Sequence, residues 1–229
     1  MQADTTVVVV AAGQGRRMGG KNKALLALGE EPVLAHVLRS LRAASCCREI
    51  IVVMNDGDRE ALGERWATTP EELGASRTVP GGAERWLSSR LGCEASSADS
   101  AIVLVHDGAR ALLTAETVDA VARAAREHGA ALAAEPLADT LKREGRGGVV
   151  HETLERAGLW RAQTPQGARR DILLAAFAAW DPAQGLPTDE AMLLEHAGHA
   201  PALVPAPASN FKLTTPDDLA LAQAWIAAQ

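Results

Sequence analysis

Short apolar runs alternate with segments of helical periodicity along most of the chain. Runs typical of buried strands are residues 6–11, 49–54, 101–105, 130–135 and 202–205, and segments typical of helices include 32–44, 114–128, 171–180 and 216–228. In the first helical segment, Leu34, Leu38 and Leu41 fall on one face. This alternation predicts an α/β fold in three layers: a mainly parallel sheet, flanked by helices on both faces, with ligands bound at the carboxyl ends of the strands.

The last helical segment has a clear start signal. Thr215 is suited to be the N-cap, and Pro216 is suited to the first helical position. Asp217 and Asp218 then place negative charge in the first turn, where the helix dipole favours it. We therefore expect a helix to begin at residue 216.

Residues 136–166 interrupt this rhythm. Two short β-like runs, 137–142 and 149–153, flank the turn-rich stretch 145–148, which favours a hairpin. A two-stranded ribbon is only marginally stable in water unless it packs against something. The ribbon therefore either lies over its own domain or forms an arm that packs elsewhere. We expect one domain over residues 1–229, with 136–166 as its β-arm.

Composition argues against several classes of protein. The 229 residues carry a formal net charge of −6, whereas proteins that bind nucleic acid or anionic membranes need a basic face. Cys46, Cys47 and Cys93 have neither paired nor metal-ligand spacing, so we expect no disulfide framework and no zinc site. The valine run at residues 7–10 is too short for a signal peptide or a membrane span. These features predict a cytoplasmic protein.

Candidate chemistry is concentrated directly after the first apolar run. Residues 11–15 are mostly small, which lets backbone N–H groups approach a ligand closely. Four cations follow within eight positions, namely Arg16, Arg17, Lys21 and Lys23. Together they can neutralise a polyphosphate, so the segment has the chemistry of a nucleotide site.

Three known loop patterns compete for this segment. The dinucleotide fingerprint G-x-G-x-x-G meets Met18 where its third glycine should stand. The phosphate loop G-x-x-x-x-G-K-[ST] meets Asn22 where a hydroxyl is needed. The pattern of nucleotidyltransferases, A-A-G-x-G-x-R-M followed shortly by a lysine, matches residues 11–18 and Lys23. We therefore favour the third pattern.

Five further motifs occur in the order found in one family. They are VHDGAR at 105–110, DTLKR at 139–143, QTPQ at 163–166, TDEA at 188–191 and NFKLTTPDDL at 210–219. With the loop, they closely resemble 2-C-methyl-D-erythritol 4-phosphate cytidylyltransferases of non-mevalonate isoprenoid synthesis, over nearly the whole chain. The resemblance implies a nucleotide-diphospho-sugar transferase-like fold. It also implies an enzyme that converts CTP and methylerythritol phosphate to 4-diphosphocytidyl-2-C-methyl-D-erythritol and pyrophosphate.

The resemblance further implies a role for particular residues. The catalytic cations that stabilise the transition state are Arg17, Lys23 and Lys212. The nucleotide is expected to contact Ala11, Ala12, Gly13, Gly15, Gly82, Ser88 and Asp107, and Asp107 is also expected to hold Mg2+. The acceptor is expected to contact Arg110 and Thr188 of one subunit, and Thr140, Arg156 and Thr164 from the arm of the other. The resemblance thus implies a homodimer joined through the arm.

Several positions depart from the family pattern. Asn22 stands where proline is common, Ala83 where an acid is frequent, and Ala111 where proline is usual. Without the proline we expect a loop that is more mobile when empty. Residues 205–212 contain no carboxylate, with Ser209 the nearest polar side chain, so Mg2+ is expected to rest on one aspartate, phosphate oxygens and water.

Two other functions stay open. A ribitol 5-phosphate cytidylyltransferase is the nearer alternative, because a five-carbon polyol phosphate presents the same phosphate and similar hydroxyl groups. A non-catalytic nucleotide-binding dimer is suggested by Ala83 and Ser209, but the catalytic cations argue against it. His106 follows an apolar strand and has no second histidine at ligand spacing, so we expect a hydrogen-bonded structural residue.

Overall fold

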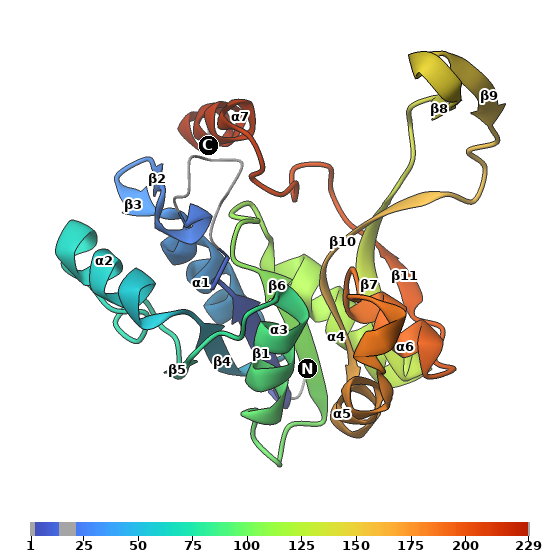
Figure 1. The fold of residues 1–229 in the computed structure, drawn as a ribbon. Helices are drawn as coiled ribbons and strands as arrows, with labels where there is room; N and C mark the ends of the chain where they lie inside the picture. Colours follow the sequence, from blue (N-terminus) through green and yellow to red (C-terminus); the bar gives the residue numbers. More distant parts are fainter. Residues whose placement is uncertain (1–2, 14–21, 229) are drawn as a thin grey trace.

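The computed structural model describes residues 3–13 and 22–228, and over these residues the centre of the molecule is a seven-stranded sheet (Figure 1). The strand order is β11-β7-β10-β6-β1-β4-β5. The bounds are β1 (Thr5–Val10), β4 (Cys47–Val53), β5 (Arg77–Val79), β6 (Ile102–Asp107), β7 (Ala130–Pro136), β10 (Trp160–Arg169) and β11 (Ala202–Pro205). Neighbours pair in parallel except at β10, which is antiparallel to β6 and β7. The predicted mainly parallel sheet is confirmed.

Helices cover both faces of this sheet. They are α1 (Val33–Ala43), α2 (Asp56–Trp66), α3 (Arg85–Glu94), α4 (Ala115–His128), α5 (Arg170–Ala179), α6 (Glu190–His196) and α7 (Pro216–Ala227). Val7 and Val9 of β1 belong to a core built with α1 and α4, whereas Val8 belongs to a core built with α3 and α5. Because both faces of β1 are buried, the strand reads as a continuous apolar run. The three-layer arrangement is confirmed.

Shorter elements complete the described chain. They are the ribbon of β2 (Ala27–Leu28) and β3 (Glu31–Pro32), and the 3-10 turns η2 (Lys23–Leu25), η3 (Arg146–Gly148) and η4 (Pro182–Gln184). Helix α7 begins as predicted: the Thr215 hydroxyl accepts from the N–H of Asp218, whose carboxylate accepts from the N–H of Thr215. None of the helices within residues 3–13 and 22–228 has the length and apolar character needed to traverse a bilayer.

Strand β10 is one that the apolar pattern does not predict. It carries the buried polar residues Gln163, Thr164 and Gln166, each of which is hydrogen-bonded. Gly167 lies where β10 meets β6, and a Cβ there would be 2.1 Å from the carbonyl oxygen of Val103. Only glycine therefore fits at this position, and its close approach packs β10 against the amino-terminal half of β6.

The arm leaves the sheet as a separate hairpin. β8 (Leu141–Glu144) and β9 (Val150–Leu154) pair antiparallel and extend away from the body of the molecule, as Figure 1 shows. The arm predicted over residues 136–166 extends too far at its C-terminal end, because residues 160–162 pair with 134–136 inside the main sheet. Thr164, which we expected to be contributed by the arm, instead lies in the central sheet of its own chain.

Candidate active site

A cavity of about 600 Å³ opens at the carboxyl ends of β1 and β6. Its walls are residues 10–13, 22–24, 82–85 and 107–109, with Ser88 and Lys212. In the sheet, β1 lies between β4 and β6. The chain continues from β1 to β4 on one side and only later adds β6 on the other side, so the carboxyl ends of β1 and β6 flank a topological switch point. Open α/β sheets bind ligands at such points. The volume is within the range of ordinary small-molecule sites, roughly 300–1,000 Å³.

Most of the predicted nucleotide-binding and catalytic residues lie together in this cavity. Its lining includes Ala11, Ala12, Gly13, Lys23, Gly82, Ser88, Asp107 and Lys212. Arg17 and Gly15 lie outside the described residues. The fold therefore brings together residues as distant in sequence as Ala11 and Lys212, while their contacts with a ligand stay predictions.

The predicted acceptor residues are more widely spread. Thr140 and Arg156 are exposed on the arm segment, where Arg156 donates a hydrogen bond to the carbonyl oxygen of Ala138. Thr188 is exposed just before α6, with its hydroxyl 3.6 Å from the Met192 sulfur. Within the described chain these residues do not line the cavity of their own subunit.

Asp107 is the electrostatic centre of the cavity. Its Oδ1 accepts from Arg85 Nε at 3.0 Å and its Oδ2 from Lys212 Nζ at 2.9 Å. Arg110 Nε lies 3.6 Å from the same Oδ2. Burial alone would raise the pKa of Asp107, but these three cations outweigh it and hold the pKa well below its usual range. Asp107 is therefore ionised at neutral pH, and its single negative charge faces three positively charged side chains.

A hydrogen-bonded chain fixes the backbone on which Asp107 stands. The Thr164 hydroxyl oxygen accepts from the N–H of Asp107 at 3.0 Å and lies 3.1 Å from His106 Nδ1. His106 Nε2 lies 3.3 Å from the carbonyl oxygen of Arg110, which can only accept. The proton is thus assigned to Nε2, and Thr164 donates to Nδ1. Burial lowers the pKa of His106 to about 4, so the ring is neutral, and the hydrogen bonding expected for this residue is confirmed.

Asn210 explains why a lysine two positions later reaches the site. Asn210 is fully buried, and its Nδ2 donates to Gln163 Oε1 at 2.8 Å and to the carbonyl oxygen of Thr164 at 2.9 Å. Its own carbonyl oxygen accepts from Arg110 Nη1 at 2.8 Å. These bonds fasten the segment to β10 and to the loop after β6, and they bring Lys212 to Asp107.

Asn22 makes contacts that a proline at this position could not make. Its Nδ2 donates to the carbonyl oxygen of Ala11, and its Oδ1 accepts from the N–H of Ala24 at 3.0 Å. Asn22 is thus the N-cap of η2 and joins that turn to the end of β1, next to Lys23. The preceding residues 14–21 lie outside the described part, so the mobility expected for the loop stays a prediction.

Segment 81–88 folds closely against the end of β1. The Ser88 hydroxyl accepts from the N–H of Gly82 at 3.0 Å. A Cβ on Gly81 would lie only 2.4 Å from the Cβ of Ala12. The close packing of two loops presents main-chain groups to the cavity, and this does not depend on the side chain at Ala83.

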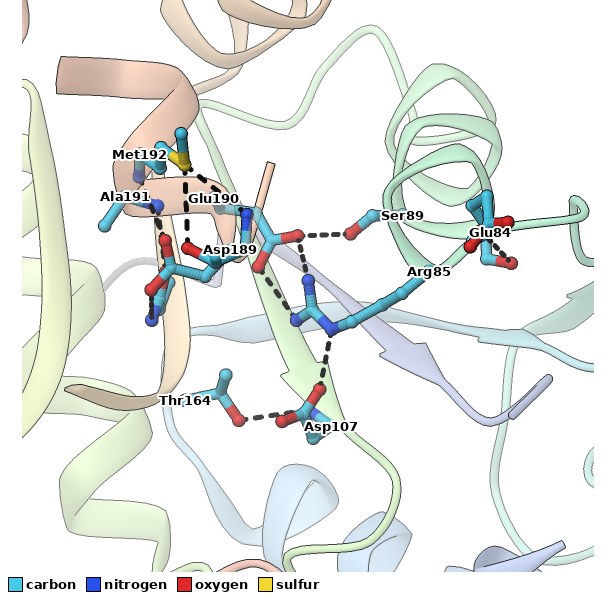
Figure 2. Close-up of polar contacts among 12 residues, drawn as sticks. Glu84, Arg85, Ser89, Asp107, Thr164, Asp189, Glu190, Ala191 and Met192 are labelled. Atoms are coloured by element: carbon cyan, nitrogen blue, oxygen red, sulfur yellow. Dashed lines mark hydrogen bonds and ion pairs between the residues drawn. The ribbon is translucent and has the colours of Figure 1, made fainter. Parts of the chain in front are cut away.

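Glu190 is a buried charge that the sequence analysis did not single out. Figure 2 shows its carboxylate between Arg85 and Ser89. Arg85 Nη1 and Nη2 donate to it at 2.9 and 3.0 Å, and the Ser89 hydroxyl donates at 2.6 Å. Its position inside the TDEA motif was the available signal, but the partner lies 105 positions away. A buried carboxylate requires such partners.

Two carboxylates line the cavity, the exposed Glu84 and the buried Asp107, and Asp107 is the one expected to meet a metal ion. In the described part of the chain, no group of three or more histidine, cysteine, aspartate or glutamate side chains could hold one alone. Mg2+ keeps several waters and is commonly bound through one or two carboxylates plus substrate phosphates. Asp107 lines the cavity and fits that mode as one protein ligand, with the remaining positions left to phosphate and water.

Comparison with known proteins agrees with this geometry. The family profile described as 2-C-methyl-D-erythritol 4-phosphate cytidylyltransferase matches residues 5–228. Relatives of that name from Alkaliphilus oremlandii (strain OhILAs) and Pelotomaculum thermopropionicum (strain DSM 13744 / JCM 10971 / SI) are 38% and 41% identical; the alignments cover 96% and 97% of this chain and 93% and 94% of theirs.

Solved structures agree as well. The 2-C-methyl-D-erythritol 4-phosphate cytidylyltransferase from Thermus thermophilus superposes with a TM-score of 0.81 at 32% identity, covering 99% of this chain and 100% of that one. The 4-diphosphocytidyl-2C-methyl-D-erythritol synthase from Anaerococcus prevotii gives 0.82 at 25% identity, covering 97% and 98%. The chain belongs to the 2-C-methyl-D-erythritol 4-phosphate cytidylyltransferase family.

Proposed function

We propose that this chain transfers the cytidylyl group of CTP to 2-C-methyl-D-erythritol 4-phosphate in the cavity between β1 and β6. The observation that carries the proposal is the cluster of three cations around buried Asp107, which outnumber its two buried carboxylates, Asp107 and Glu190. Arg85, Arg110 and Lys212 surround Asp107, and Lys23 lines the same cavity. Such a site suits a ligand with several negative charges, as CTP and a sugar phosphate together provide.

The reaction needs positive charge more than it needs a base. An oxygen of the acceptor phosphate attacks the α-phosphorus of CTP, a new P–O bond forms, and pyrophosphate leaves with the electrons of the bond that breaks. The second pKa of a phosphate monoester is about 6, so the nucleophile is already largely a dianion at neutral pH. His106 is neutral, buried and hydrogen-bonded on both ring nitrogens, and we give it no part in proton transfer.

Arg17, Lys23 and Lys212 are proposed to stabilise the charge that grows on the α-phosphoryl group and on the leaving pyrophosphate. Preorganised charges of this kind often supply the largest part of a rate enhancement. Asp107 would hold Mg2+, which when bound supplies further neutralisation of the phosphates. Cytosine is proposed to be read by main-chain groups of residues 11–13 and of the segment around Gly82 and Ser88.

The arm is proposed to complete the site of a second subunit in a homodimer. Thr140 and Arg156 are exposed on it, and Val149 and Val150 expose apolar surface at its tip. An apolar tip on a two-stranded ribbon is stabilised when it packs on a partner. Thr188 and Arg110 would contact the acceptor from the subunit that binds CTP, and Thr164 supports Asp107 of that same subunit.

Pyrophosphate release tests the proposal directly. The enzyme is incubated with CTP and methylerythritol phosphate, with and without Mg2+, and separately with ribitol 5-phosphate or with ATP or GTP in place of CTP. We expect release that depends on Mg2+ and prefers CTP and methylerythritol phosphate. Equal or faster turnover of ribitol 5-phosphate would make the chain a ribitol phosphate cytidylyltransferase, and no release with any pair would favour the non-catalytic dimer.

A further inference from the structure

Glu190 is a charged group with no access to solvent. The residue is 0% exposed and is the first residue of α6. Three donors satisfy its carboxylate: both terminal nitrogens of Arg85 and the hydroxyl of Ser89. This carboxylate fixes the position of the Arg85 guanidinium, because moving that group away would leave a buried charge unpaired.

Arg85 has two sides, and each side binds a different carboxylate. Its terminal nitrogens face Glu190, and its Nε donates to Asp107 Oδ1, as Figure 2 shows. The planar guanidinium allows this double contact, whereas lysine would offer a point charge. Burial would lower the pKa of Arg85, but the two carboxylates raise it, so the cation is permanent. Arg85 also lines the cavity.

The contact joins three elements that carry different parts of the site. Arg85 begins α3 and lies within segment 81–88, which is proposed to read cytosine. Glu190 begins α6, two positions after Thr188, which is proposed to contact the acceptor. Asp107 ends β6 at the proposed metal position. One guanidinium therefore connects the nucleotide side, the acceptor side and the metal side of the cavity.

We propose that Glu190 is a positioning residue for cytidylyl transfer, which acts by holding Arg85 so that Arg85 contacts one oxygen of Asp107 and leaves the other to Lys212. The proposal rests on the proposed function, since it names the arrangement that the transfer requires. Without the charge of Glu190, Arg85 is free to turn its terminal nitrogens toward Asp107. A bidentate contact would then compete with Lys212 for that carboxylate.

The test compares Glu190→Gln with a matched control, Glu49→Gln. Glu49 also accepts from an arginine, a hydroxyl and an N–H, namely Arg77, Thr6 and Ser97, but it lies at the amino end of β4, opposite the cavity. Groups that orient a metal ligand typically contribute about 10- to 100-fold to activity or metal affinity. We expect Glu190→Gln to lower kcat about 10- to 100-fold with the KM for CTP within about threefold, and Glu49→Gln to stay within about twofold of the wild type in both.

A double-mutant cycle separates positioning from a general loss of structure. If Glu190 acts through Arg85, then Arg85→Gln combined with Glu190→Gln is no slower than Arg85→Gln alone. Effects that multiply, or a Glu190→Gln enzyme whose kcat matches the Glu49→Gln control, would overturn the proposal. An inactive wild type would instead overturn the proposed function, which the same assay distinguishes.

A smaller change covers the case in which Glu190→Gln does not fold. Ser89→Ala removes only the 2.6 Å hydrogen bond to Glu190 and keeps both charges. We expect it to lower kcat by several-fold in the same pattern, with the melting temperature followed by circular dichroism. A Ser89→Ala enzyme with wild-type kcat would count against the positioning of Arg85 by this carboxylate.

Discussion

Replacing Lys212 with glutamine should separate catalysis from stability. Its ammonium group lies 2.9 Å from Asp107 Oδ2, yet its side chain is 38% exposed. Asp107 keeps two other cations when the lysine charge is removed, since Arg85 lies at 3.0 Å and Arg110 at 3.6 Å. The variant therefore leaves no buried carboxylate without a cation, while one positive charge disappears from the cavity.

The two expected magnitudes differ enough to be measured independently. Ion pairs with an exposed partner contribute about 0–1 kcal/mol to the free energy of unfolding, so we expect Lys212→Gln to lower it by less than about 1 kcal/mol. Loss of one preorganised charge donor typically costs about 10²- to 10³-fold in kcat, or about 2.7–4 kcal/mol of transition-state stabilisation. Lys212→Gln should thus reduce transition-state stabilisation far more than it reduces the free energy of unfolding.

Pyrophosphate release and urea denaturation measure the two quantities on the same preparation. Arg126→Gln is the control, because Arg126 is also partly exposed, at 36%, and pairs with an aspartate, Asp4, at the far end of β1. It should share the small change in stability and keep wild-type kcat. If Lys212→Gln raises only the KM for CTP while kcat holds, Lys212 binds ground state and transition state equally, and its proposed role is refuted.

Three further outcomes are expected. Arg156→Ala and Lys23→Ala chains, each nearly inactive alone, should regain about a quarter of wild-type activity when mixed equally, since half of the dimers are mixed and each mixed dimer has one intact site; tagged heterodimers that stay inactive would show that Arg156 serves its own chain. Asn22→Ala should lower the free energy of unfolding by about 1 kcal/mol, as for other N-caps, and an unchanged urea midpoint would contradict the capping role. Because burial lowers the pKa of His106 to about 4, against about 6.5 when unfolded, the unfolded state gains the proton first as pH falls; stability should therefore decline between those values more steeply than in His106→Gln, and parallel declines would contradict this.

The fold could be predicted where an element has a recognisable local pattern in the sequence, such as a continuous apolar run or a capping signal. Strands β1 and β6 are buried on both faces, so their residues form continuous apolar runs. Helix α7 begins with local capping signals, which need no knowledge of the rest of the chain. Strand β10 has no such continuous apolar run, because its buried side chains include two glutamines and a threonine. Their burial is compensated by partners such as Asp189 and Asn210, which only the folded chain brings near.

The same distinction applies to the site. Lys23 and Asp107 each follow an apolar run closely, so local sequence was sufficient to predict them at the sheet edge where ligands bind, whereas Lys212 was assigned through the resemblance of its motif to the family. Glu190 also stands in a motif, but what makes it informative is complete burial beside Arg85, and burial of a charge is not visible in a polar stretch of sequence. In the sequence, an exposed glutamate looks the same as a buried one that is paired with an arginine. The two are distinguished only when the structure shows the cation beside the buried one. Sequence patterns thus identify groups that line the cavity, whereas the groups that hold them in place are found through their long-range partners.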